Sequence, residues 1–243
     1  NYRSSPKIEK IAEKLGELNV KRFGTHSFVL KGQAIDSGVP SEAVYVSDRN
    51  FVKSLEDKRY ENVTVIVSSA RKKEELRKKL GKTEILTVAE SKGLERNAVV
   101  LCDVLSDNLD KWNYLYSMSL SRKTADENSV FRYYFNLFYV GISRAKQYLI
   151  VAESAPPKFF NEFFDECFDK KDKISATKFL SDVAGKITLD DEELIERIQR
   201  FIQLEQYENA RYAADRISDD TIMKETVNRI DVNEKFIRYG LIK

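Results

Sequence analysis

Three short segments of this sequence combine residue types that can bind phosphate groups. Residues 1–4 read N-Y-R-S, residues 87–95 read T-V-A-E-S-K-G-L-E, and residues 137–146 read L-F-Y-V-G-I-S-R-A-K. Arginine suits spread phosphate charge because its planar guanidinium donates several hydrogen bonds. Glycine allows a ligand to approach the backbone closely. The second segment therefore suggests a ligand near its glycine and the third suggests phosphate binding, but both have a simpler explanation when taken alone.

The middle segment predicts a tight turn between two strands. Gly93 can adopt backbone angles that are closed to other residues. Its neighbours Lys92 and Glu95 carry opposite charges at a strand end, where open α/β sheets bind ligands. On this segment alone, an ordinary glycine turn with solvated charges is the better explanation.

The third segment predicts an aromatic-rich helix that ends near Arg144 and Lys146. Its aromatic residues recur at helical spacing and are expected in the core. The small neighbours Gly141 and Ser143 leave room for the Arg144 guanidinium to extend toward a partner. On this segment alone, a cation that stabilises the C-terminus of a helix is the better explanation.

The elements that must position these residues follow from short apolar runs, which alternate with helical patterns. We expect a first helix from Pro6, strands at 27–30, 43–47, 63–68, 84–88, 98–102 and 148–152, and helices at 50–58, 70–80 and 131–146. This alternation favours βαβ units and a mainly parallel sheet. Residues 105–130 are polar and are expected to form a partly helical surface excursion, which Trp112 docks onto the domain.

After Pro156 and Pro157 the pattern becomes helical only, with helices expected at 158–168, 175–184, 190–204, 207–217 and 219–230. We therefore divide the chain into a domain of residues 1–155 and a helical extension of residues 156–243, either a small bundle or a pair resembling tetratricopeptide helices. Residues 1–154 hold 26 Lys and Arg against 20 Asp and Glu, and residues 155–243 hold 15 against 19. The resulting balances of +6 and −4 suggest two units with different partners.

Composition excludes several classes of protein. Hydrophobic residues make up 42% of the 243 residues, which is enough for a folded core. Two cysteines and the single His26 exclude a disulfide scaffold and the usual Cys/His zinc site, and they leave little room for histidine-based nucleophilic catalysis. No apolar run approaches the roughly 18 residues of a membrane helix, and no signal peptide opens the chain. We expect a cytoplasmic protein without a membrane partner, and a chain that begins inside a longer one because it lacks an initiator Met.

In this order, the three segments together resemble motifs IV, V and VI of the second motor domain of superfamily 1 helicases of the UvrD/Rep type. The third segment is similar to the family pattern Y-V-A-x-T-R-A. The resemblance covers about residues 1–153. It implies an α/β fold, with a RecA-like mainly parallel sheet flanked by helices, followed here by an all-α C-terminal extension.

The resemblance also implies roles for individual residues in an ATP cleft. Tyr2 would stack on the adenine, and Arg3 would reach the terminal phosphate. Gly93 and Glu95 would line the nucleotide side of motif V, and Arg144 would be the arginine finger. The cofactor would be ATP with Mg²⁺, and the metal would be held mainly by the other motor domain.

A single-stranded or duplex DNA partner is implied as well, with Thr87, Ser91 and Lys92 as the candidate strand contacts. Two positions depart from the family. Ala89 stands where relatives commonly have His, and Arg96 stands where an aromatic usually follows L-E. Both departures bear on how this domain would bind a strand.

The sequence contains no G-x-x-x-x-G-K-[ST] phosphate loop. We therefore expect an upstream motor domain in the parent chain, and no ATP hydrolysis by this chain alone. A second hypothesis is a degenerate helicase-like domain that serves as a protein-binding or scaffold module. A third is an unrelated nucleotide-binding α/β domain. The acidic extension is expected to contact a protein partner or to pack on the motor domain.

Overall fold

A computed structural model describes residues 4–23, 41–48, 50–51, 53–55, 60, 62–80, 83–117, 125–171 and 174–240. Tyr2 and Arg3, and the strand predicted at 27–30, lie outside the described residues. The chain divides into two compact units, residues 1–187 and residues 188–243. The predicted domain boundary after residue 155 lies inside the first of these units.

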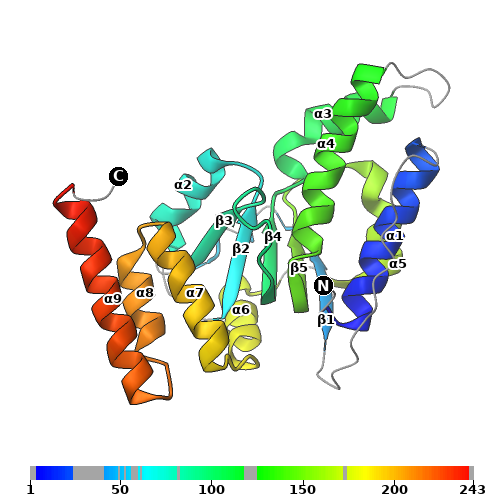
Figure 1. Cartoon of the computed structure of the whole chain (residues 1–243). Coiled ribbons are helices and arrows are strands. Elements are labelled where there is room, and N and C mark those ends of the chain that lie inside the picture. Colours follow the sequence, from blue (N-terminus) through cyan, green and yellow to red (C-terminus); the bar gives the residue numbers. More distant parts are fainter. Residues whose placement is uncertain are drawn as a thin grey trace. The chain divides into compact units, whose positions relative to one another are not determined.

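The first unit is built on a parallel sheet of six strands in the order β3-β2-β4-β5-β1-β6 (Figure 1). The strands are β1 (Glu42–Val46), β2 (Val63–Val67), β3 (Glu84–Thr87), β4 (Arg96–Cys102), β5 (Ala145–Ala152) and β6 (Asp169–Lys171). Each described pair of neighbouring strands is parallel. Residues of β2 and β4 are buried throughout, as expected for strands that are covered on both faces. The predicted fold class is confirmed.

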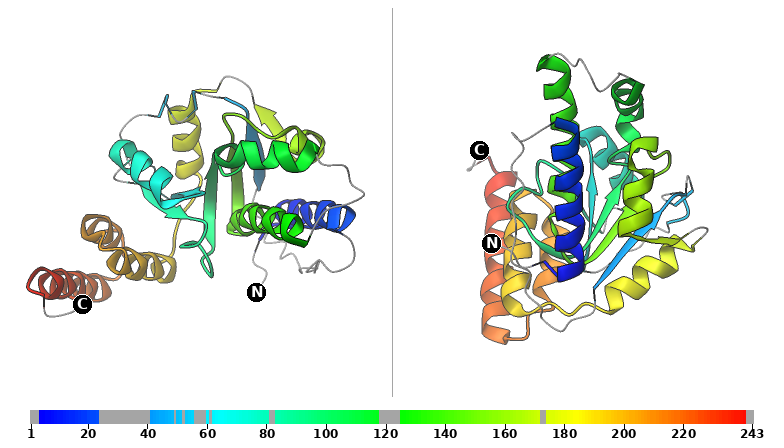
Figure 2. Two further views of the ribbon diagram at one scale, coloured as in Figure 1. Left: turned by 90° about the horizontal axis from the view of Figure 1, so that it is seen from above. Right: turned by 90° about the vertical axis from the view of Figure 1, so that its right-hand side faces the viewer.

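Helices pack on both faces of this sheet. They are α1 (Pro6–Phe23), α2 (Ala70–Leu80), α3 (Leu109–Ser117), α4 (Ala125–Ile142), α5 (Asn161–Cys167) and α6 (Ala176–Gly185), with short 3₁₀ turns at Ser106–Asn108 and Lys158–Phe160. The view from above in Figure 2 shows α1 and α4 side by side on one face and α6 on the opposite face. Alternate strand residues, such as Val99 and Leu101, join the α1 and α4 core, as the pleat of a strand requires.

An aromatic cluster closes that core. Trp112 of α3 is 1% exposed and contacts Phe160 with ring centroids 5.0 Å apart. Phe138 of α4 lies 5.4 Å from Phe160. Trp112 therefore docks the segment after β4 onto the domain, which confirms the prediction for this residue.

Several elements differ from the sequence prediction, and residues 50–51 and 53–54 form turns where a helix was predicted at 50–58. Helix α4 begins at Ala125 and ends at Ile142, whereas the prediction ran from residue 131 to residue 146. Ser143 and Arg144 form a turn, and Lys146 already belongs to β5. The segment after Pro157 is not purely helical, because Asp169–Lys171 pairs with β1 as the sixth strand. Three polar residues at the end of a sheet give no apolar run, so the prediction missed this strand.

The second unit consists of α7 (Asp191–Gln203), α8 (Tyr207–Ala214) and α9 (Asp220–Arg238). Asp190 and Asp219 cap the N-termini of α7 and α9 by accepting backbone N–H bonds. Leu194, Ile198, Phe201, Ala210, Ala214 and Ile230 form its core. The C-terminal extension is therefore helical in this unit, as the fold prediction stated.

Across the described residues, no helix combines the length and the apolar character that crossing a membrane requires.

Candidate functional site

Hydrogen bonds to backbone carbonyls bring three motif segments together at the amino edge of the sheet, where the strands begin. The Ser4 hydroxyl donates to the Ala145 carbonyl at 2.8 Å, and the Ser5 N–H donates to the Lys146 carbonyl at 2.7 Å. The Arg96 N–H donates to the Arg144 carbonyl, also at 2.8 Å. The start of α1, the loop before β4 and the turn before β5 are thus neighbours, although they are far apart in sequence.

Arg144 lies where these three segments meet, and three hydrogen-bond acceptors hold its side chain. Its Nε donates to the Val140 carbonyl at 3.1 Å, its Nη1 to the Leu94 carbonyl at 3.1 Å, and its Nη2 to the Ser143 hydroxyl at 3.0 Å. Burial lowers the pKa of Arg144, and the nearby Glu95 carboxylate opposes that shift. The side chain stays charged, because an arginine cannot be deprotonated under ordinary conditions.

Gly93 and Glu95 flank the Leu94 carbonyl that binds Arg144. Gly93 has φ +78°, in the left-handed region that glycine adopts without strain. A Cβ built there would meet no heavy atom within 4 Å, so the backbone at Gly93 is open on that side. Glu95 is half-buried and immediately precedes β4. It therefore lies at the amino edge of the sheet and not at the carboxyl ends of the strands, where open α/β sheets usually bind ligands.

The other end of the same loop begins at Thr87, the last residue of β3. Glu90 accepts hydrogen bonds from the Thr87 N–H at 2.8 Å and from the Thr87 hydroxyl at 3.2 Å. The Lys73 ammonium from α2 contacts both Glu90 oxygens, at 2.7 and 2.8 Å. Burial alone would raise the pKa of Glu90, but the Lys73 ammonium and the Thr87 N–H lower it below its ordinary value. These contacts fix the turn after β3 against α2.

Ser91 and Lys92 differ in what they present to solvent. Ser91 is 1% exposed and donates its hydroxyl to the Val88 carbonyl at 2.8 Å. Lys92 is exposed. The hydroxyls of Thr87 and Ser91 thus hold the loop in shape, while Lys92 presents a positive charge.

Arg96 forms a buried ion pair that the sequence analysis missed. Its Nε and Nη2 donate to the two Glu84 oxygens at 3.0 and 3.2 Å, and Glu84 also accepts from the Thr64 hydroxyl. Arg96 is 8% exposed and Glu84 is 3% exposed. Charged residues are almost never fully buried without a partner, so Glu84 inside an apolar strand was the available signal. The departure from the family at position 96 therefore has a structural cause.

Gly141 also departs from the pattern Y-V-A-x-T-R-A, which has Ala at this position. A Cβ at Gly141 would lie 2.9 Å from Leu101 Cδ2 and 3.2 Å from Leu101 Cδ1. Leu101 is fully buried in β4. The Leu101 side chain therefore occupies the space that an alanine at position 141 would need.

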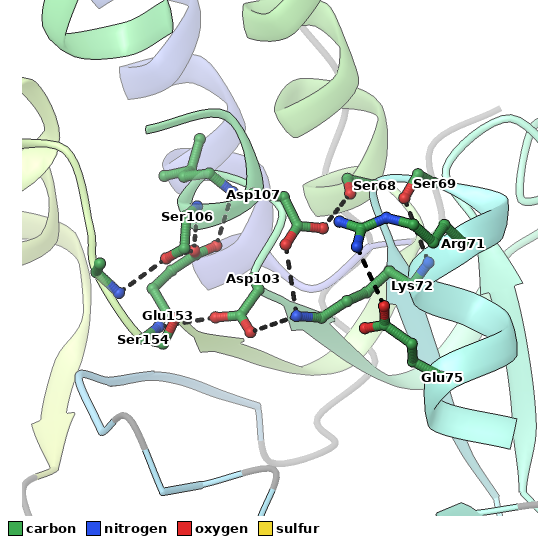
Figure 3. A network of polar contacts seen from close by, with 12 residues as sticks. Ser68, Ser69, Arg71, Lys72, Glu75, Asp103, Ser106, Asp107, Glu153 and Ser154 are labelled. Atoms are coloured by element: carbon green, nitrogen blue, oxygen red, sulfur yellow. Dashed lines mark hydrogen bonds and ion pairs between the residues drawn. The ribbon is translucent and has the colours of Figure 1, made fainter. Parts of the chain in front are cut away.

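The opposite, carboxyl edge of the sheet holds a separate polar network (Figure 3). Strands β2 and β4 are neighbours, but the chain runs from β2 to β3 on one side and from β4 to β5 on the other. Ligands of open α/β sheets usually bind at such a switch point, where the strand order reverses. Here Lys72 lies between two carboxylates, 3.2 Å from Asp103 and 3.4 Å from Asp107. Burial lowers the pKa of Lys72, but these two carboxylates raise it above its ordinary value. Ion pairs thus occupy this switch point.

Glu153 is the most buried charge-bearing group of that edge. It accepts from the Leu105 N–H at 3.1 Å, from the Ser106 N–H at 2.8 Å and from the Ser106 hydroxyl at 2.6 Å. Burial raises the pKa of Glu153 to about 8, against the opposing effect of these donors. Asp103 accepts from the Ser154 N–H at 2.8 Å, so the loops after β4 and β5 are joined by two carboxyl groups.

The predicted site residues thus fall into three groups. Gly93, Glu95 and Arg144 are brought together at the amino edge, and Ser4 bonds there beside them. Thr87, Ser91 and Lys92 lie at or after the end of β3. Tyr2 and Arg3 are outside the described residues. Within the described residues, no three or more His, Cys, Asp or Glu side chains gather so that they could hold a metal ion.

Comparison with known proteins gives three findings. A solved structure described as the C-terminal domain of a possible DNA helicase from Lactobacillus plantarum WCFS1 is similar over 70% of this chain and 98% of that chain, with 15% identity and a TM-score of 0.41. No curated protein matches the chain. The model of the UvrD-like helicase C-terminal domain matches residues 44–155, a range from β1 through β5 that includes the second and third motif segments. Residues 44–155, which include the central strands of the sheet, are therefore similar to a UvrD-like helicase C-terminal domain.

Proposed function

We propose that this chain supplies the C-terminal motor half of an ATP-dependent DNA helicase. One observation carries the proposal. A charged arginine, an open glycine and a glutamate converge at the amino edge of the sheet, next to the start of α1. Spread phosphate charge is bound by this kind of donor set, because guanidinium and open backbone can both approach phosphate oxygens.

In this proposal Arg144 acts as the arginine finger. The three bonds that hold it use three of the five guanidinium N–H groups. The second N–H groups of Nη1 and Nη2 are then the ones that would donate to phosphate oxygens. ATP bound with Mg²⁺ would supply the phosphoryl group, and Arg144 would stabilise the negative charge that develops on it during transfer.

The remaining site residues take supporting roles. Arg3 would reach the terminal phosphate, Tyr2 would stack on the adenine, and Gly93 and Glu95 would line the cleft. A Walker-A motor domain of the parent chain would hold the metal and most of the nucleotide. The chain alone would then be inactive as an ATPase, because hydrolysis would require both walls of the cleft.

DNA would be contacted from the other end of the same loop. We propose that Lys92 meets the phosphate backbone, because it is exposed and charged. Thr87 and Ser91 are proposed as strand contacts of the same loop. Their hydroxyls currently bond within the turn, so they would meet a strand only after exchanging those bonds. We also propose that the protein is cytoplasmic.

The helical unit of residues 188–243 is proposed to contact a protein. It carries 9 Lys and Arg against 13 Asp and Glu, and this balance disfavours DNA. Val232, Phe236, Ile237 and Tyr239, at the end of α9, are large apolar residues that are at least 38% exposed. Exposed apolar residues close together are typical of protein contacts.

The test is Arg144→Ala in the chain reunited with its Walker-A domain. Loss of an arginine finger is expected to reduce DNA-stimulated kcat for ATP by about 10³-fold or more. The matched control is Arg71→Ala, an exposed arginine of α2 that pairs only with its helix neighbour Glu75 in the described structure, and it should keep normal kcat. If Arg144→Ala kept kcat near that of the unmodified protein, the finger role would be wrong and the scaffold hypothesis would be favoured.

A further inference from the structure

Ser143 stands between Arg144 and the helix that precedes it. The Ser143 hydroxyl donates to the Val140 carbonyl at 2.9 Å and accepts from Arg144 Nη2 at 3.0 Å. The same Val140 carbonyl accepts from Arg144 Nε at 3.1 Å. Nε and Nη2 of the guanidinium are therefore tied to the end of α4 through one carbonyl and one hydroxyl.

The remaining terminal nitrogen is tied to a different segment. Arg144 Nη1 donates to the Leu94 carbonyl at 3.1 Å, and this carbonyl follows the left-handed turn at Gly93. The three acceptors bind all three nitrogens of the guanidinium, whose N–H bonds diverge within one plane. The plane of the guanidinium is thus set by two segments that meet only at the amino edge.

We propose that Ser143 is a positioning residue for Arg144, and that its hydroxyl and the Leu94 carbonyl together fix the direction in which the free N–H bonds of the guanidinium point. This inference rests on the proposed function for its consequence in ATP hydrolysis. The geometry itself belongs to the isolated chain and can be measured there. Without the hydroxyl, Nη2 loses its acceptor and the guanidinium can rotate about the Nε–Cζ bond.

The first experiment measures that rotation by NMR in the isotope-labelled full chain, with the Arg144 signals assigned through Arg144→Lys. In Ser143→Ala, rotation about Nε–Cζ is expected to be about tenfold faster, since one hydrogen bond to a charged group is lost. Ser143→Thr keeps the hydroxyl and should restore the slow rate. Ser181→Ala is the matched control, because Ser181 also donates its hydroxyl to a carbonyl of its own helix, Thr177 at 2.7 Å, away from Arg144.

Equal rotation rates in Ser143→Ala and the unmodified chain would overturn the positioning role. If Ser143→Ala did not fold, Ser143→Cys would replace it, because the thiol has a similar volume but is a weak hydrogen-bonding group. A rate in Ser143→Cys faster than in Ser143→Thr would then support the role, and equal rates would overturn it.

The second experiment uses the chain reunited with its Walker-A domain. Ser143→Ala is expected to lower kcat for ATP about tenfold with KM changed less than twofold, and Ser143→Thr should restore kcat. If Arg144→Ala left kcat unchanged, the proposed function would fail, and the NMR result would still decide the positioning role. If Arg144→Ala abolished activity and Ser143→Ala changed neither rotation nor kcat, the positioning role alone would fail.

Discussion

The two edges of the sheet each hold a cation, but the partners of the two cations differ. At the carboxyl edge, Lys72 lies within 3.4 Å of two carboxylates, Asp103 and Asp107. At the amino edge, Arg144 is held by two carbonyls and a hydroxyl, which are all uncharged. Lys72 is thus neutralised where it lies, whereas Arg144 is oriented by uncharged hydrogen-bond acceptors and has the Glu95 carboxylate only as a neighbour.

This difference shows that a fold can either orient a charged side chain toward an outside ligand or neutralise it in an internal ion pair. A cation paired with two carboxylates contributes to stability, and it offers little to an anion from outside. A cation held by dipoles keeps its attraction for an anion, and its orientation is already set. The edge that ligands usually occupy in open α/β sheets holds ion pairs here, and the proposed site lies at the other edge.

The largest expected effect is on the other arginine of the amino edge. Arg96 is neutralised by Glu84 in a buried pair, so Glu84→Ala would leave a buried guanidinium without its carboxylate. Removing one partner of such a pair costs about 3–5 kcal/mol of unfolding free energy. Urea denaturation would measure the loss.

Glu74→Ala provides the control for this variant, because Glu74 pairs with Arg77 on the exposed face of α2 and should change stability by less than about 1 kcal/mol. The double variant Glu84→Leu with Arg96→Met should recover most of the loss, since it buries no charge. Equal effects of Glu84→Ala and Glu74→Ala would contradict the difference between buried and exposed charges.

The next prediction concerns the carboxyl edge and pH. The pKa of Glu153 is raised to about 8 in the folded chain, from an ordinary value of 4.5, so the folded state binds its proton more tightly than the unfolded state. The stability that this proton contributes is present below pH 4.5 and is lost as pH rises toward 8. Between these limits, unfolding free energy should fall by about 1.4 kcal/mol per pH unit from this group.

Denaturation of Glu153→Gln at several pH values checks this assignment. The variant cannot titrate at this position. Its unfolding free energy should therefore lack the fall of about 1.4 kcal/mol per pH unit that Glu153 causes between pH 5 and pH 8. Glu162→Gln, on α5, is a control at a carboxylate that is exposed. The same slope in Glu153→Gln and in the unmodified chain would show that Glu153 does not hold the proton.

The smallest expected effect is at Gly93. Because a Cβ there would meet no atom within 4 Å, Gly93→Ala tests only the cost of a left-handed backbone, about 1 kcal/mol. Thermal denaturation measures the loss. Gly185→Ala is the matched control, since it also has open space but no positive φ, and it should be neutral or stabilising. A neutral Gly93→Ala would mean that the turn presenting the Leu94 carbonyl relaxes at no cost.

Sequence reasoning predicted the strands β1 to β5, because each is a short apolar run bounded by polar residues. It also selected Gly93, Glu95 and Arg144, which the structure brings to one edge. It could not predict the Glu84–Arg96 pair, since the two residues come together only when β3, β2 and β4 are ordered side by side. The Leu94 partner of Arg144 was equally hidden, because the two residues are 50 positions apart and meet only in the folded sheet.

The contact between Gly141 and Leu101 has a consequence for divergence among related sequences. A methyl group at position 141 and a leucine at position 101 compete for the same volume, so the two positions should not both be large in one sequence. Homologues with alanine at position 141 are expected to carry valine or alanine at position 101. Positions 141 and 101 would then have changed together during evolution, because a smaller side chain at position 101 leaves room for a methyl group at position 141.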